Sequence, residues 1–341
     1  MAAKIRLAAL AFAMAGALVT AAPAQAQVSD WSSVVQAAKK EGSVVVYSMA
    51  LGAPYYNEVV RAFERKYGIK VESLDLRASE LVERIRTEQA AGRFIGDVEL
   101  ISSTMIEEQV VADKYVQKFP AVPNAANLRQ PFATTDFAVP AYIQAFGILV
   151  NTQLVKPEEQ PKSWSDLLDP KWKGKILSDD MRPLGSGSTM FAVLHKEMPA
   201  GFHEKLARQQ LVFSRDMRND ARRVARGEYA FYIPQVFAFA SDLKGLPVKV
   251  VAPVEGAPYA LLEFALLRNA PHPNTARLLV NHFLEAESQL VYANAWNAPV
   301  IGGIVERANA DARPFAESKL MGAATLAERP GMMELARKIY K

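Results

Sequence analysis

The stretch Met181–Thr189 places glycines, hydroxyl side chains and an arginine directly ahead of an apolar run. Backbone N–H groups exposed at a helix start, with serine and threonine hydroxyls beside them, bind anions well. Arg182 adds a planar guanidinium that can hold a carboxylate or phosphate through two hydrogen bonds. We therefore expect Arg182, Ser186, Gly187 and Ser188 to contact an anionic ligand. A loop that only caps an ordinary helix explains the spacing equally well, and the stretch lacks the Gly-Lys-Ser/Thr of a nucleotide-binding loop.

Five further side chains are candidates for the same site. Ser48 ends the first apolar strand and Ser103 follows the third, and ligands of parallel sheets bind beyond the carboxyl ends of the strands. Arg215 precedes an expected helix, where its guanidinium can face a cleft. Tyr142 and Tyr232 belong to expected strands, although tyrosines in such places are more often partly buried core residues. Together with the glycine-rich stretch, these residues form the predicted ligand site.

The residue patterns of common catalytic sites are missing. The chain has no cysteine and no Gly-x-Ser-x-Gly sequence, and its carboxylates include no obvious acid–base pair. The four histidines, His195, His203, His272 and His282, lack metal-binding spacing such as His-Glu-x-x-His. We therefore expect a binding protein that uses no cofactor, and we do not expect an enzyme.

The first 26 residues have the organisation of a secretory signal peptide. Lys4 and Arg6 precede an uncharged apolar run from Leu7 to Thr20. The following segment, Ala21–Ala26, ends in the small-x-small pattern that signal peptidase recognises. Because the apolar run is short for a membrane span, we expect residues 1–26 to be cleaved and the mature chain to work in the periplasm.

The charge balance of the mature chain is nearly neutral. The leader holds two of the 40 Lys and Arg residues and none of the 36 Asp and Glu residues, so its removal lowers the net charge from +4 to +2. Nucleic-acid-binding domains usually carry a dense basic stripe. Nucleic acid is therefore not an expected partner.

Strand and helix patterns alternate along the first part of the mature chain. Short strands are expected at 44–47, 69–74 and 97–101, with amphipathic helices between them at 54–67 and 79–92. Connections of this kind predict a parallel sheet with right-handed crossovers.

The rest of the chain has a different order of elements. Extended segments are expected at 137–142 and 146–151, followed by a second mixed block from Trp164 to about Pro258. The tail has a helical pattern that includes a helix at 274–286.

Five short segments resemble the extracellular solute-binding proteins that serve bacterial ABC importers. They are Glu41–Ser48, Phe63–Ile69, Ser163–Ile176, Ala225–Glu228 and Val251–Gly256. The third is the most specific, and the likeness runs over nearly all of the mature chain. The resemblance implies an α/β, two-lobed periplasmic-binding-protein fold of type II. Each lobe would be a mostly parallel sheet flanked by helices, with a hinge between the lobes.

The resemblance also implies lobe boundaries and partners. Lobe I would hold residues 27–137 and 260–305, and lobe II would hold 138–259, with 306–341 as an optional addition. The protein would capture a small solute between the lobes and deliver it to an inner-membrane ABC permease, and we expect it to be a monomer. The Gly/Ser/Arg stretch favours an organic anion as the solute: a carboxylate, a phosphonate or a phosphorylated compound.

The nearest branch resembles the ferric-iron-binding proteins, which typically use adjacent tyrosines in the second lobe. Here the corresponding stretch, Tyr229–Phe237, lacks the paired tyrosines, and Met49–Gly52 offers no histidine. Iron binding stays open as an alternative, with Tyr142, Tyr232 and Tyr259 as phenolate candidates. A secreted hydrolase is the third hypothesis, from a different class.

Overall fold

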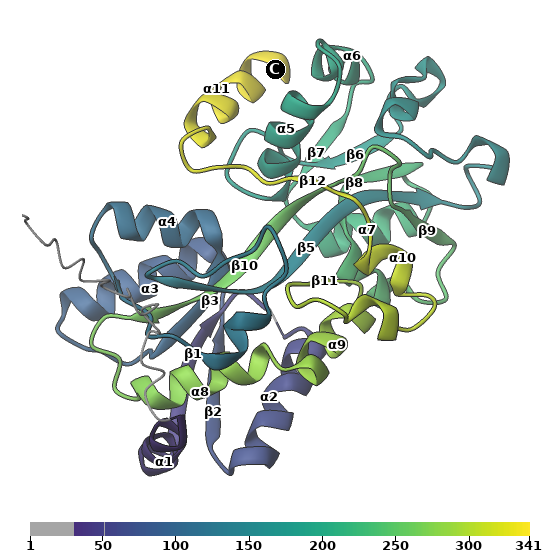
Figure 1. Ribbon diagram of the computed structural model, residues 1–341. Coiled ribbons are helices and arrows are strands. Elements are labelled where there is room, and N and C mark those ends of the chain that lie inside the picture. The colour runs from purple at the N-terminus through teal and green to yellow at the C-terminus, as the bar shows by residue number, and fades with distance from the viewer. Residues whose placement is uncertain (1–30, 51) are drawn as a thin grey trace, which may run out of the picture.

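The computed structural model describes residues 31–50 and 52–341, apart from the side chains of Ala78 and Ser79, and forms two α/β lobes (Figure 1). The leader expected at 1–26 lies outside the described residues. None of the helices in the described part of the chain combines the length and apolar character needed to cross a membrane.

Lobe I, the lower part of Figure 1, is built on a parallel core of three strands in the order β2-β1-β3. The strands are β1 (Ser43–Ser48), β2 (Lys70–Asp75), β3 (Val98–Ser102) and the short β4 (Val116–Gln117) and β11 (Ala298–Pro299). The helices are α1 (Trp31–Glu41), α2 (Pro54–Tyr67), α3 (Ala78–Ala90), α4 (Ser103–Val111), α8 (Pro273–Phe283), α9 (Ala286–Asn294) and α10 (Arg313–Ala316). The expected alternation of parallel strands and helices is confirmed here.

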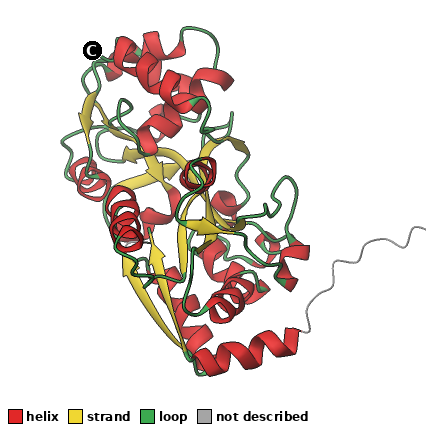
Figure 2. Ribbon diagram, turned by 90° about the vertical axis from the view of Figure 1, so that its left-hand side faces the viewer, coloured by secondary structure: helices red, strands yellow, loops and turns green. Residues whose placement is uncertain are grey.

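Lobe II repeats this plan with a parallel set in the order β8-β6-β7. Its strands are β6 (Ile176–Asp179), β7 (Val212–Ser214), β8 (Phe231–Val236) and β9 (Val248–Val251). Its helices are α5 (Ser186–Glu197), α6 (Phe202–Ala207), α7 (Met217–Ala225) and α11 (Arg329–Ile339). Figure 2 shows the C-terminal helix at the end of the molecule opposite α1.

Two long antiparallel strands, β5 (Ala138–Asn151) and β10 (Ala257–Leu267), connect the lobes. β5 pairs with β10 from Ala138 to Ala145, and from Phe146 onward it pairs with β8 and β9 instead. The two extended segments expected from sequence are therefore one continuous strand. A third connection follows, because β12 (Leu320–Gly322) pairs with the start of β10 before the chain enters α11.

The tail differs from the sequence expectation in one respect. The helix expected at 274–286 is divided, since α8 ends at Phe283 and α9 begins at Ala286. The N–H of Leu284 bonds to the carbonyls of Val280 and Asn281, which ends the first helix in a tightened turn.

Two of the segments that carried the family resemblance contact each other. The side chain of Glu255 accepts hydrogen bonds from the Ser163 hydroxyl and from the backbone N–H of Trp164. The Trp164 indole N–H donates to the carbonyl of Gly256 at 3.0 Å, and the indole is fully buried. These contacts tie the start of the Ser163–Ile176 segment to the turn that leads into β10.

The C-terminal helix reaches back to lobe I. Arg329 at the start of α11 pairs with Glu108 of α4, with Nη1 and Oε2 3.0 Å apart. The rest of α11 packs on α5 and α6 of lobe II. This ion pair therefore joins the two lobes outside the strands that connect them.

We predict that Arg329→Ala weakens the contact between α11 and α4 and so favours a more open arrangement of the lobes. Partly exposed ion pairs contribute about 0–1 kcal/mol, so the open form should gain up to about fivefold in population. Small-angle scattering of the ligand-free protein checks this through the radius of gyration. Arg337→Ala, on the same helix, is the matched control. Scattering curves that coincide for Arg329→Ala and the unaltered protein would contradict the prediction.

A carboxyl group is buried without a counter-charge inside lobe I. Glu99 on β3 is fully buried, and its only hydrogen bond in the described structure comes from the Gln109 amide at 3.3 Å. Burial raises the pKa of Glu99 to about 8, although that hydrogen bond opposes the rise. Glu263 on the adjacent strand has its pKa raised to about 7 by burial and by Glu107.

The consequence is a stability that falls as the pH rises. Between the ordinary glutamate pKa and about 8, the folded protein holds a proton on Glu99 that the unfolded chain has released. We predict that Glu99→Gln raises the thermal midpoint at pH 8 and leaves it nearly unchanged at pH 4. Thermal unfolding across this range measures it, with the exposed Glu72→Gln as control. A midpoint at pH 8 that stays the same in Glu99→Gln would refute the assignment.

Candidate functional site

The glycine-rich stretch forms the start of α5, as expected, but its anion-binding groups already have partners. Arg182 donates through Nε and Nη2 to the two oxygens of Asp180, at 2.8 and 3.0 Å. The backbone N–H of Gly187 donates to Asp179 Oδ2 at 2.7 Å. Ser188 exchanges hydrogen bonds with the backbone of Gly185. In this conformation the protein's own carboxylates occupy the positions that a ligand anion would take.

Asp179 is therefore a capping group for α5. It ends β6, is almost fully buried, and satisfies a backbone donor at the positive end of the helix. Burial raises its pKa to about 6, while the Gly187 N–H and the charge of Arg215 oppose the rise. The sequence analysis missed this residue, although an aspartate that ends a strand just ahead of a helix start is a recognisable capping signal.

Gly187 is required by close packing. A Cβ built at this position would lie 2.6 Å from the carbonyl oxygens of both Asp179 and Asp180. These are backbone atoms, so a side chain cannot be accommodated by a rotamer change.

We predict that Gly187→Ala lowers the free energy of unfolding by about 2–4 kcal/mol through this clash. Denaturant unfolding measures it. Gly302→Ala is the control: it has space for a Cβ and an ordinary backbone, so the free energy of unfolding should hardly change. Gly174→Ala would not serve, because its φ of +72° strains any side chain. Equal stabilities for Gly187→Ala and Gly302→Ala would contradict the prediction.

The two predicted serines lie at the carboxyl edge of the lobe I sheet. Ser48 is fully buried, and its hydroxyl accepts the N–H of Ala50 at 2.8 Å, which stabilises the turn after β1. Ser103 is the first residue of α4 and is partly exposed. The adjacent Ser102 and Thr104 are also partly exposed, so this edge presents several hydroxyls.

Arg215 and Tyr232 lie in lobe II. Arg215 is exposed, is close enough to influence Asp179 and Asp180, and forms no ion pair within 4.0 Å in the described part of the chain. Tyr232 is buried among apolar residues near α7, and its hydroxyl has no described hydrogen-bond partner. Burial raises the pKa of Tyr232 well above its usual value, and the charge of Asp179 adds to the rise.

Tyr142 belongs to a cluster of three tyrosines beside the hinge. Its ring stacks on Tyr292 with 4.4 Å between centroids, and Tyr55 meets both rings edge-on at 6.1 and 5.2 Å. Tyr55 comes from the start of α2, Tyr142 from β5 and Tyr292 from α9. Of these three, only Tyr142 is predicted from the sequence, because Tyr55 and Tyr292 lie in apolar stretches of helices and look like core residues.

The hydroxyls of Tyr55 and Tyr292 have no hydrogen-bond partner in the described structure, although both rings are buried. The Oδ1 atom of Asn297 is likewise buried and unpartnered. Burial raises the pKa of Tyr55. The side chains that oppose this rise from close by are those of Gln144, Tyr142, Asn297 and Arg218.

Arg218 brings the second lobe to this cluster. It is the second residue of α7, its guanidinium lies over the Phe239 ring at 4.8 Å, and its Nε is 3.5 Å from Asp242. Its positive charge is near enough to Tyr55, on lobe I, to oppose the rise in the pKa of that hydroxyl. The Tyr55 hydroxyl therefore lies on the side of this cluster that faces lobe II.

Comparison with known proteins decides the family. Residues 95–323, about two thirds of the chain, match the family described as "Bacterial extracellular solute-binding protein". The chain belongs to this family. The described fold agrees, since it superposes on the substrate-binding protein of an ABC transporter from Agrobacterium tumefaciens. That match has a TM-score of 0.73 and 16% identity, over 88% of this chain and 94% of that one.

A further solved structure and a curated protein are also similar to this chain. Apo ferric-ion-binding protein A of Pasteurella haemolytica matches with a TM-score of 0.70 and 20% identity, over 87% of this chain and 96% of that one. The spermidine/putrescine-binding periplasmic protein of Escherichia coli K12 is 32% identical over 174 residues, 47% of this chain and 48% of that protein. Solute-binding proteins of this kind are periplasmic, deliver small molecules to ABC permeases and are not enzymes.

The structure does not gather the three candidate iron ligands of this solute-binding protein. Tyr142 lies in a lobe I cluster and Tyr232 in a lobe II cluster, while Tyr259 is half-buried beside Arg129 and Phe132. Across residues 31–50 and 52–341, no group of three or more His, Asp or Glu residues is arranged to hold a metal ion.

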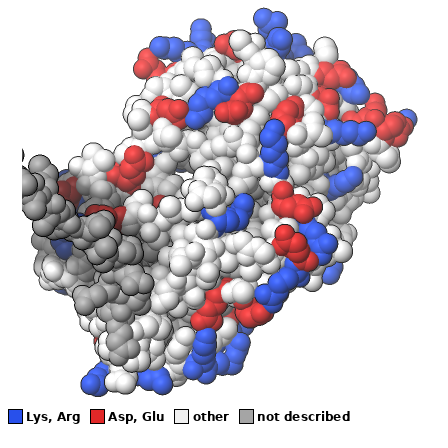
Figure 3. All heavy atoms as spheres, viewed as in Figure 1, with Lys and Arg blue, Asp and Glu red and all other residues white. Residues whose placement is uncertain are grey.

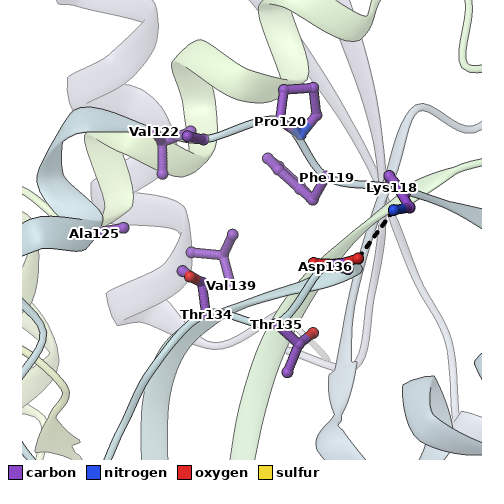
Figure 4. A pocket seen from close by; sticks show the side chains of 10 residues that line it. Lys118, Phe119, Pro120, Val122, Ala125, Thr134, Thr135, Asp136 and Val139 are labelled. Atoms are coloured by element: carbon purple, nitrogen blue, oxygen red, sulfur yellow. Dashed lines mark ion pairs between the residues drawn. The ribbon is translucent and has the colours of Figure 1, made fainter. Parts of the chain in front are cut away.

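A separate pocket of about 410 Å³ opens on lobe I (Figure 4). Phe119, Val122 and Val139 line it, and Lys118 pairs with Asp136 at its side, 3.0 Å apart. None of its lining residues belongs to the predicted ligand site. The face of the solute-binding protein seen in Figure 3 carries interspersed basic and acidic side chains, without a continuous area of one sign.

Proposed function

We propose that this protein binds a small organic anion, such as a carboxylate, between its lobes and delivers it to an ABC permease. The observation that carries the proposal is the pair of buried, unpartnered hydroxyls of Tyr55 and Tyr292 at the lobe junction. A buried hydroxyl without a partner costs free energy, so this arrangement favours a ligand that supplies acceptor oxygens.

The neutral state of these two tyrosines favours an anionic ligand over a cationic one at their hydroxyls. Burial raises the pKa of Tyr292 well above its usual range, and the neighbouring tyrosines add to the rise. Both hydroxyls therefore stay neutral and act as hydrogen-bond donors. Arg218 and the exposed Arg215 add positive charge on the lobe II side. The sequence favoured the loop ahead of α5 as the source of hydrogen-bond donors to the ligand. The structure leads us to favour the tyrosine hydroxyls beside the hinge instead.

The remaining expectations from the sequence fit this proposal. The predicted leader would export the protein, and the protein would act as a monomer without nucleic acid. The ligand would bind a closed conformation that is rarely populated without it, and so shift the protein toward that form. The permease would recognise the closed form.

We predict that Tyr55→Phe and Tyr292→Phe each weaken carboxylate binding about tenfold, since hydrogen bonds to charged groups contribute about 1.5–3 kcal/mol. The thermal midpoint without ligand should not fall and should rise slightly, because neither hydroxyl has an internal partner and the burial of each costs free energy. Calorimetry against a panel of carboxylates measures the affinity. Tyr340→Phe is the control, since its hydroxyl bonds to His203 at 2.8 Å, far from the hinge; it should lower stability and leave affinity unchanged. Unchanged affinity in both hinge variants would overturn the proposal.

Ferric iron is the second candidate, and the three clustered tyrosines favour it. Phenolates are hard oxygen ligands, and three of them at 4.4–6.1 Å ring separation could converge on one ion. Iron would have to displace protons that burial holds in place. Iron–tyrosinate absorbs visible light, so a colourless sample after ferric loading excludes this candidate.

A further inference from the structure

Asp75 ends β2 at the edge of the lobe I sheet that faces the hinge. The parallel register places it beside Ser48, at the end of β1. Its Oδ2 atom accepts the N–H of Gly52 at 3.1 Å, which fixes the carboxylate against the loop ahead of α2. This position belongs to the same interlobe region as the tyrosine cluster.

The second oxygen of this carboxylate is left without a partner. Oδ1 of Asp75 is buried and accepts no hydrogen bond from any described residue. No Lys, Arg or His among residues 31–50 and 52–341 pairs with it within 4.0 Å. A buried anionic oxygen in this condition is costly, and a cation delivered by a ligand would relieve that cost.

The surroundings of Asp75 suit an organic cation. Burial raises the pKa of Tyr56, Tyr142 and Tyr292, and the charge of Asp75 adds to each rise, so these rings lie within its electrostatic reach. Aromatic rings attract ammonium groups through their electron-rich faces. A metal ion would need further anionic ligands, and the described residues offer no cluster of three acidic or histidine side chains.

We propose that Asp75 binds a protonated amino group, so that the captured solute carries an ammonium at one end and a carboxylate at the other. This inference rests on the proposed function, because the carboxylate end would occupy the donors of Tyr55 and Tyr292. The two hydroxyls and the carboxylate lie around one junction, which suits a short, unbranched zwitterion.

The test is calorimetry of the mature protein with matched probes. These are unbranched ω-amino carboxylates from β-alanine to 6-aminohexanoate, each compared with the plain carboxylate and the plain amine of the same length. In the unaltered protein the best amino carboxylate should bind at least about tenfold more tightly than its carboxylate counterpart. Asp75→Asn should abolish this difference without weakening plain carboxylate binding, because it removes a like charge near the carboxylate position. The asparagine oxygen can still accept the Gly52 N–H, so folding should be retained. Asp136→Asn, an exposed lobe I carboxylate, is the control and should behave like the unaltered protein.

The outcomes separate this inference from the proposed function. If carboxylates bind and the amino group adds nothing, or Asp75→Asn weakens both probe classes alike, the Asp75 assignment fails and anion binding stands. If only the amines bind and Asp75→Asn abolishes that binding, the assignment stands and the anion proposal fails. If no probe binds, both are overturned.

Discussion

The pairing of β5 with β10 is the constraint on which the rest of the structure depends. Both strands are continuous across the lobes, and β5 exchanges its partner near Ala145, from β10 to β8 and β9. Backbone hydrogen bonds therefore connect the lobes, and apolar packing continues across the hinge, where Val236 and Ala238 join the lobe I core. This arrangement directs the carboxyl ends of both parallel strand sets toward the hinge, where loops of different sequence can meet.

The polar groups at that junction fall into two kinds. Around the start of α5 the donors are paired internally, by Asp179 and Asp180. These donors therefore need no ligand to complete their hydrogen bonds. Around the tyrosine cluster the polar atoms of Tyr55, Tyr292 and Asn297 are buried and unpartnered. Native proteins rarely leave such groups unsatisfied, and their concentration at one place is the reason we propose the ligand site here.

Two of the segments that resemble the family contact each other in the folded protein. Trp164 and Glu255 join two of the recognised segments, and one of these leads directly into β10. The resemblance thus lies in residues that hold the hinge strand in place. It carries the fold alone. The iron-binding protein of Pasteurella haemolytica shares this fold, and the likeness does not assign its ligand to this chain.

The sequence alone determined the parallel strand–helix order of lobe I, the position of α5 and the family resemblance, because hydrophobic periodicity and short local motifs act over a few residues. It also placed Ser48 and Ser103 at the ends of the first and third strands, whereas Tyr142, expected at the end of an extended segment, lies inside β5. It did not reveal that β5 is one strand, that β10 is a central strand, or that Arg182 is held by Asp180. Nor did it connect Tyr55, Asp75, Asn297 and Tyr292, which come from three elements and a loop spread over more than two hundred residues. Those facts depend on which groups meet in space and on which buried polar atoms remain unpaired, and only the packed tertiary structure decides that.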